Sequence, residues 1–113
     1  MRVLVCGGRD FSDEADLRDY MNRLHAEKKI SLLIHGGARG ADSLAGQWAI
    51  DYSIPVQVFP ADWATHGRSA GPRRNEQMLA EGKPDLVVAF KGGKGTAHMV
   101  SIAYRKHVAI LRP

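Results

Sequence analysis

The sequence predicts an α/β fold with a five-stranded, mainly parallel sheet and helices on both of its faces. Five short runs of Val, Ile and Leu alternate with helix-length amphipathic stretches along the 113 residues. The apolar runs are nearly continuous, as expected for strands that are covered on both sides. Glycine-rich turns follow three of these runs, at the places where a parallel sheet connects to its helices.

The predicted strands are rich in β-branched residues and leucine, which favour a pleated, buried surface. They cover residues 2–6, 31–35, 56–59, 85–90 and 108–111. The order strand, helix, strand repeats to the end of the chain, which indicates right-handed crossovers and a Rossmann-like sheet. No linker, repeat or low-complexity stretch interrupts this order, so we expect one domain over residues 1–113.

Four helices are predicted between the strands, at residues 13–28, 41–52, 70–81 and 96–106. The first has Ser12 as its expected cap, an acidic first turn, and apolar residues at helical spacing from Leu17 to Leu24. Pro72 suits the first turn of the third helix, because a proline there loses no intrahelical hydrogen bond. The segment 60–69 is longer than most connections of its kind and is therefore a candidate lid. The alternatives are that Trp63 or His66 covers a base, or that Trp63 packs onto the domain and His66 is a solvated loop residue.

Composition excludes several classes of protein. Apolar residues make up 44% and charged residues 25% of the chain, as in ordinary globular proteins. No apolar run is long enough to span a membrane and no signal peptide is evident, so we expect a cytoplasmic protein without membrane contact. The single cysteine, Cys6, is predicted to be a packed residue. The net charge of +4 favours anionic partners such as phosphates or nucleic acid.

The glycine-rich turns follow the first, second and fourth predicted strands, at residues 7–10, 35–42 and 91–96. Parallel sheets bind ligands at the carboxyl ends of their strands, and glycine lets the backbone approach a phosphate near a helix start. Arginine and asparagine at the start of the third helix suit a phosphate and a sugar. The predicted ligand-binding residues are Gly7, Gly8, Arg9, Gly36, Gly37, Arg39, Gly40, Arg74, Asn75, Gly92, Gly93, Gly95 and Thr96.

Three carboxylates near these turns are candidate catalytic residues: Asp10, Asp42 and Glu76. Cleavage of an N-glycosidic bond needs a carboxylate that stabilises positive charge on the sugar or activates water. Helix capping competes with catalysis as the explanation for Asp42, and turn formation competes with it for Asp10. His35 is predicted to pack rather than to act as a base. No metal site and no cofactor are predicted, because no Cys/His cluster has ligand spacing.

Four motifs together resemble the YspA-like branch of the SLOG superfamily over nearly the whole chain. They are V-C-G-G-R-D-F from Val5, H-G-G-A-R-G-A-D-S-L-A from His35, A-D-W-A-T-H-G-R-S-A-G-P-R-R-N from Ala61, and K-G-G-K-G-T-A from Lys91. The resemblance implies a Rossmann-like domain that binds a nucleotide-type ligand. It does not imply an established reaction, and it suggests a homo-oligomer.

Two related groups of proteins suggest alternative activities. LOG phosphoribohydrolases cleave a nucleoside monophosphate, and their P-G-G-x-G-T-x-x-E motif is similar to residues 91–99, with Lys91 in place of the proline and Met99 in place of the glutamate. This similarity implies a phosphate-binding loop without that catalytic carboxylate. DprA, which binds single-stranded DNA, has a loop similar to residues 36–42 and an Arg-Asn pair similar to Arg74-Asn75.

The sequence thus predicts a protein that binds a nucleotide or a nucleotide-derived small molecule through glycine-rich phosphate loops. It leaves open whether the protein is a sensor or an N-glycosidase-type hydrolase. The main alternative is a module that binds single-stranded nucleic acid, although no row of aromatic residues for base stacking is evident. A third alternative is an interaction domain whose site has decayed.

Overall fold

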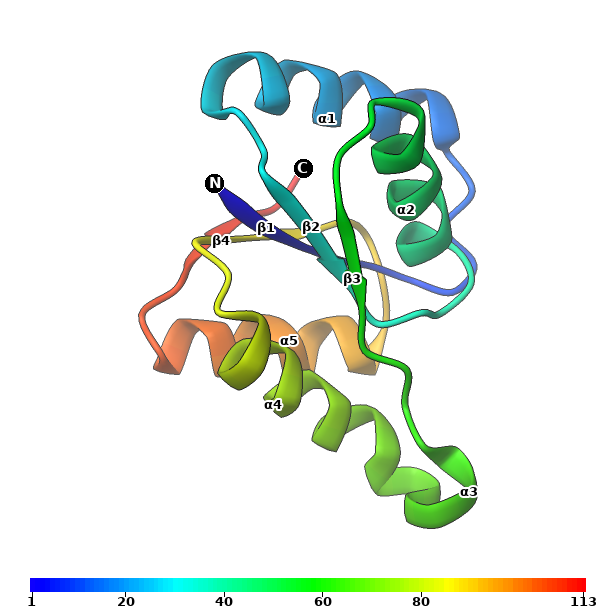
Figure 1. The fold of residues 1–113 in the computed structure, drawn as a ribbon. Helices are drawn as coiled ribbons and strands as arrows, with labels where there is room; N and C mark the ends of the chain where they lie inside the picture. Colours follow the sequence, from blue (N-terminus) through cyan, green and yellow to red (C-terminus); the bar gives the residue numbers. More distant parts are fainter.

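A computed structural model describes residues 1–113 and shows a five-stranded sheet in which every neighbouring pair of strands is parallel (Figure 1). The spatial order is β3-β2-β1-β4-β5. The strands are β1 (Arg2–Cys6), β2 (Leu32–His35), β3 (Val56–Val58), β4 (Leu86–Ala89) and β5 (Ala109–Leu111). The predicted α/β class, the parallel sheet and all five strands are confirmed, each within two residues of its expected ends.

Two pairs of helices cover the two faces of the sheet (Figure 1). One face carries α1 (Glu14–Lys28) and α2 (Ala41–Asp51), and the other carries α4 (Ala70–Gly82) and α5 (Lys94–Arg105). Side chains that alternate along β1 separate the two cores: Val3 and Val5 pack under α1 and α2, whereas Leu4 and Cys6 pack under α4 and α5. Burial of β1 on both faces explains why its apolar run does not alternate with polar residues.

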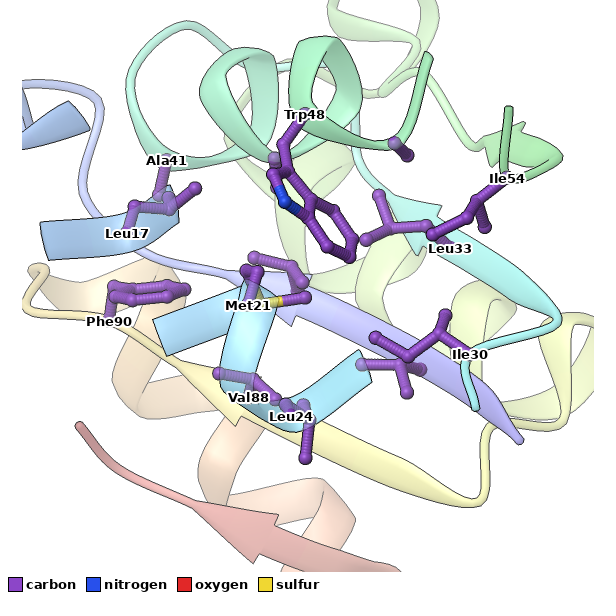
Figure 2. Packing of buried hydrophobic residues seen from close by; sticks show 14 of the residues in the cluster. Leu17, Met21, Leu24, Ile30, Leu33, Ala41, Trp48, Ile54, Val88 and Phe90 are labelled. Carbon is purple, nitrogen blue, oxygen red and sulfur yellow. The ribbon is translucent and has the colours of Figure 1, made fainter. Parts of the chain in front are cut away.

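The core under α1 and α2 contains the largest buried side chain of the protein, Trp48. Figure 2 shows Trp48 pointing from α2 toward Met21 of α1 and Leu33 of β2. Its indole nitrogen donates a hydrogen bond of 2.8 Å to the side-chain oxygen of Asn22 on α1. Burial of an indole requires such a partner, and the bond ties α1 to α2.

One local prediction was wrong. The cap of α1 is Asp13 rather than Ser12, because the Asp13 carboxylate accepts the backbone N–H of Asp16 at 3.1 Å. The segment 60–69, the candidate lid, contains a short helix that was not predicted, α3 (Trp63–His66), and a 3₁₀ turn, η1 (Gly67–Ser69). Asp62 caps α3 by accepting the backbone N–H of Thr65 at 3.1 Å. A four-residue helix is too short to show a helical period in the sequence.

Candidate functional site

A large cavity, of about 1100 Å³, lies at the carboxyl ends of β1 and β4. These strands are neighbours in the sheet, although residues 7–85 separate them in the chain. The chain builds outward from β1 to β2 and β3 on one side, and from β4 to β5 on the other, so the strand order reverses between β1 and β4. Parallel sheets bind their ligands at this point, because the loops diverge there and leave a crevice.

The loop from β4 to α5 forms one wall of this cavity with Gly92, Gly93, Gly95 and Thr96, all predicted ligand-binding residues. No protein acceptor is found for the backbone N–H groups of Lys94, Gly95 and Thr96, which form the first turn of α5. A Cβ at Gly93 or Gly95 would meet no atom within 4 Å. The loop therefore presents free N–H donors and the positive end of a helix dipole to open space.

The loop from β1 to α1 also lines the cavity. The N–H of Gly8 donates to the carbonyl of Lys91 at 2.9 Å, which joins this loop to the β4–α5 loop. A Cβ on Gly92 would overlap the Thr96 hydroxyl and lie 2.6 Å from the Gly8 nitrogen, so the contact requires glycine. Gly7, Gly8, Arg9 and Asp10 all line the cavity. Asp10 is 96% exposed and pairs with Arg39 at 3.4 Å.

The loop from β2 to α2 is arranged differently. Gly36, Gly37 and Arg39 lie outside the large cavity and line a smaller one of about 440 Å³. Gly40 lines neither cavity: its φ is +80°, and a Cβ would overlap the carbonyl oxygens of Gly8 and Arg9. The structure therefore places Gly40 at a packing contact between the start of α2 and the β1 loop.

Asp42 is the buried carboxylate of the large cavity, with only 6% of its surface exposed. Its Oδ2 accepts the N–H groups of Gly36 at 3.0 Å and Ala38 at 3.2 Å, so it fixes the β2–α2 loop rather than capping its own helix. No protein donor is found for Oδ1. Burial raises the pKa of Asp42 to about 6, against the lowering effects of these hydrogen bonds and of the Arg74 charge.

Cys6 lies at the floor of the same cavity. Burial raises the pKa of its thiol to about 12, and the Asp42 charge adds to this effect. The thiol is therefore protonated at neutral pH and is a poor nucleophile, which agrees with the prediction of a packed residue. His35 is also buried, and its Nδ1 accepts the N–H of Gly37 at 3.0 Å.

Arg74 and Asn75 lie at the start of α4 and are held in one hydrogen-bond network. Arg74 donates from Nη1 to the Gly36 carbonyl at 2.6 Å and from Nε to the Asn75 Oδ1 at 3.0 Å. The buried Asn75 donates from Nδ2 to the Gly95 carbonyl at 3.2 Å and contacts Nδ1 of His98 at 3.1 Å. Because arginine only donates, it fixes the orientation of the Asn75 amide, and His98 Nδ1 must accept.

This network bears on the prediction that Arg74 and Asn75 bind a phosphate and a sugar. Both residues line the cavity, but Asn75 mainly joins α4 to the start of α5. Arg74 keeps one nitrogen, Nη2, without a protein acceptor. Burial lowers the pKa of Arg74, and the nearby Asp42 charge opposes this effect.

The other residues singled out in the sequence differ in whether they line the cavity. Trp63 lines the cavity, is 48% exposed and lies under the guanidinium of Arg9, whose Cζ is 5.2 Å from the ring centroid. His66 does not line it. Glu76 does not line the cavity and forms an ion pair at 3.6 Å with Lys106, the residue after α5, so the structure does not bring this carboxylate to the site. Met99, at the position of the LOG glutamate, is fully buried in the core.

Among the cavity residues that were not predicted as site residues, four have basic side chains: Arg68, Lys91, Lys94 and His98. The two lysines flank the glycines of the 91–96 turn, so their position in that turn was the available signal. Arg68 precedes α4 in the segment predicted to be a lid. His98 lies two residues after the glycine turn, and no sequence motif predicted it as a site residue. The three arginines and two lysines of the cavity, Arg9, Arg68, Arg74, Lys91 and Lys94, make five cationic side chains. Three carboxylates also line it, Asp10, Asp13 and Asp42.

The fold and this cavity define a Rossmann-like α/β protein with a cation-lined site at the reversal of strand order. Comparison with known proteins identifies the family within this broad class. The model of a family described as "YspA, cpYpsA-related SLOG family" matches residues 1–66. The Gene 61 protein of Mycobacterium phage D29 is 33% identical over 118 residues, covering 97% of this chain and 94% of that protein. No solved structure matches the chain.

The chain therefore belongs to the YspA, cpYpsA-related SLOG family, which confirms the resemblance drawn from its motifs. Membership suggests nucleotide-related binding in general. The family match ends within α3, so it includes the β1 and β2 loops but not the β4–α5 loop. No helix is long and apolar enough to cross a membrane.

Proposed function

We propose that residues 1–113 act as one domain that binds a nucleotide or a nucleotide-derived small molecule in the large cavity. The observation that carries the proposal is the first turn of α5, where the N–H groups of Lys94, Gly95 and Thr96 have no protein acceptor. Free N–H groups at a helix start bind phosphate, and the helix dipole adds to the attraction. The five cationic side chains around the cavity favour the same charge.

The cavity also has room for the rest of a nucleotide. Its volume of about 1100 Å³ slightly exceeds the usual range for small-molecule sites, roughly 300–1,000 Å³. Trp63 offers a half-exposed ring on the wall formed by α3, and we assign it to the base. His98 presents an Nε2–H donor when it is neutral, since its Nδ1 accepts from Asn75, and we assign it to the sugar or phosphate.

Asp42 is the carboxylate that we assign to a hydrolytic reaction at this site. In such a reaction water adds to the anomeric carbon, the N-glycosidic bond breaks, and the base leaves with a proton. A carboxylate beside the sugar stabilises the positive charge that develops on it or accepts the proton of the water. Asp42 is buried in the cavity wall with Oδ1 free of protein donors, whereas Asp10 is exposed and Glu76 lies elsewhere.

The test is a binding titration of the purified protein with the four ribonucleoside 5′-monophosphates, with mass spectrometry of each mixture for free base and ribose 5-phosphate. Ligand at about 100 times its Kd adds about 2.7 kcal/mol of stability, which a thermal unfolding curve resolves. Gly93→Leu places a side chain in open space at the phosphate loop, so it keeps the fold and weakens binding at least about tenfold.

Ala97→Leu is the matched control, because Ala97 lies on an exposed part of α5 and does not line the cavity. Equal affinity of the wild type and Gly93→Leu would refute the phosphate position. Asp42→Asn should bind the nucleotide without releasing base. Base release by this variant at the wild-type rate would show that Asp42 takes no part in the reaction. If the wild type binds the nucleotide and releases no base, the protein is a binding protein and not a hydrolase.

A single-stranded nucleic-acid module remains the second candidate, favoured by the cationic side chains at the cavity mouth. Arg9, Lys91 and Lys94 are exposed there and suit a phosphate backbone. Binding of this kind weakens steeply with salt and strengthens with oligonucleotide length, whereas a mononucleotide site shows little of either. Titrations with oligodeoxynucleotides of increasing length at two salt concentrations separate the two functions.

A further inference from the structure

A second, smaller cavity of about 440 Å³ adjoins the large one. It is lined by the β2–α2 loop, by Arg9 from the β1 loop, by Arg74 of α4 and by residues from Pro60 to Trp63 that lead into α3. Its volume falls within the range of small-molecule sites. The function proposed above places no part of the ligand in it.

The two cavities share the side chains of Arg9, Trp63 and Arg74 as a partition. The Arg9 guanidinium stacks on the Trp63 ring, with its Cζ 5.2 Å from the ring centroid, and both side chains line both cavities. Arg74 is fixed by its bonds to Gly36 and Asn75, and its Nη2 has no protein acceptor. A group that extends from one cavity to the other would therefore pass a positioned guanidinium that has hydrogen-bonding capacity left.

The side chains that line the small cavity are positively charged and suit an anion. Three arginines line it, Arg9, Arg39 and Arg74, and no carboxylate does. The nearest paired carboxylate, Asp10, contacts Arg39 at 3.4 Å and is 96% exposed, so a ligand competes with it easily in water. Asp42 faces the large cavity instead. Arginine is well suited to phosphate, because its planar fork donates two parallel hydrogen bonds.

We propose that the small cavity is a second phosphate subsite of the same binding site, and that the ligand carries two phosphate groups on either side of the partition. One phosphate lies at the start of α5, and the other lies among Arg9, Arg39 and Arg74. This inference rests on the proposed function, because that function supplies the first phosphate. The ligand class is a nucleotide with a second phosphate on its sugar, which is either a nucleoside bisphosphate or a dinucleotide.

Isothermal titration of the full chain tests this assignment with three sets of probes: nucleoside 5′-monophosphates, nucleoside 3′,5′-bisphosphates and 5′-phosphorylated dinucleotides. The wild type should bind the best two-phosphate probe at least about tenfold more tightly than its monophosphate. Arg39→Gln should remove most of this preference and leave monophosphate affinity within about twofold, since Arg39 lines only the small cavity. Arg73→Gln is the matched control, because Arg73 is an exposed arginine that lines neither cavity.

The outcomes separate the two proposals. If the monophosphate binds but the second phosphate adds less than about twofold, the second subsite is refuted and the proposed function stands. If no probe binds, the proposed function fails and the inference fails with it. A dinucleotide that binds more tightly than the bisphosphate supports the subsite and identifies the dinucleotide as the ligand, and equal affinities support a bisphosphate. Affinity that continues to rise with oligonucleotide length overturns the inference in favour of a nucleic-acid track.

Discussion

The β2–α2 and β4–α5 loops look alike in sequence and differ in what their backbones do. Each follows a buried parallel strand, contains several glycines and begins a helix at a glycine that has no side-chain cap, Gly40 in one and Gly93 in the other. In the β2–α2 loop the protein itself uses the N–H groups of residues 36–38, since Asp42 accepts from Gly36 and Ala38 and His35 accepts from Gly37. In the β4–α5 loop the N–H groups of residues 94–96 have no protein acceptor.

The glycines differ in the same way. Gly40 is required by its positive φ and by its contact with the β1 loop, whereas a side chain at Gly93 or Gly95 would extend into open space. Glycine therefore serves packing in the first loop and leaves a surface free for a ligand in the second. The buried carboxylate of Asp42 supplies the acceptor for two of the N–H groups of the first loop, those of Gly36 and Ala38.

The largest effect is expected at Gly40. Gly40→Ala forces a residue with a side chain to φ +80° and brings its Cβ against two backbone carbonyls, so we expect a loss of about 3–5 kcal/mol in the free energy of unfolding. Urea denaturation measures this loss. Gly67→Ala is the matched control, because Gly67 has φ +54° but no atom within 4 Å of a Cβ. Equal losses in the two variants would show that the contact between α2 and the β1 loop contributes nothing.

A smaller, pH-dependent effect is expected at Asp42. Its folded pKa of about 6 lies above the ordinary value of 3.8, so the folded protein holds the proton more tightly than the unfolded chain. The Asp42 contribution to stability is therefore most favourable below pH 4 and is lost as the pH rises through 6, by about 3 kcal/mol in total. Asp42→Asn keeps an acceptor for the loop and cannot ionise. Unfolding curves of both proteins from pH 4 to pH 8 should show the variant gaining on the wild type as the pH rises, and parallel curves would contradict the assignment.

The sequence predicted the fold well because each strand and long helix has its own local signal. β1 and β4 are read from continuous apolar runs, and α5 from the spacing of Met99, Ile102 and Ala103, all of which are buried. The short helix α3 has no such signal, although Asp62 three residues before Thr65 is an N-cap pattern that could have located its start. The choice between Ser12 and Asp13 as the cap of α1 depends on one residue of register, which local pattern does not fix.

The candidate site was harder to predict because it depends on which side chains meet across the sheet. The sequence places Glu76 next to Arg74 and Asn75, but a helical turn of 100° per residue directs it toward Lys106, at the end of α5, instead. His98 reaches the cavity only because Asn75 of α4 lies beside α5. The number of glycines in a loop likewise does not reveal whether a distant carboxylate uses its N–H groups.

The smallest effect is expected in the open loop, at Gly95, and there stability and binding should change in opposite directions. Gly95 is the second residue of α5, its φ is not positive, and a Cβ meets no atom within 4 Å. Gly95→Ala should therefore raise the free energy of unfolding by about 0.5–1 kcal/mol, because alanine loses less conformational entropy on folding. The same methyl group lies beside the free N–H groups and should weaken nucleotide binding several-fold. Urea denaturation and isothermal titration of one preparation measure both effects, with Gly71→Ala, at the second residue of α4, as the control for stability. A variant that is more stable and binds as well as the wild type would show that the first turn of α5 is as closed to ligands as the β2–α2 loop.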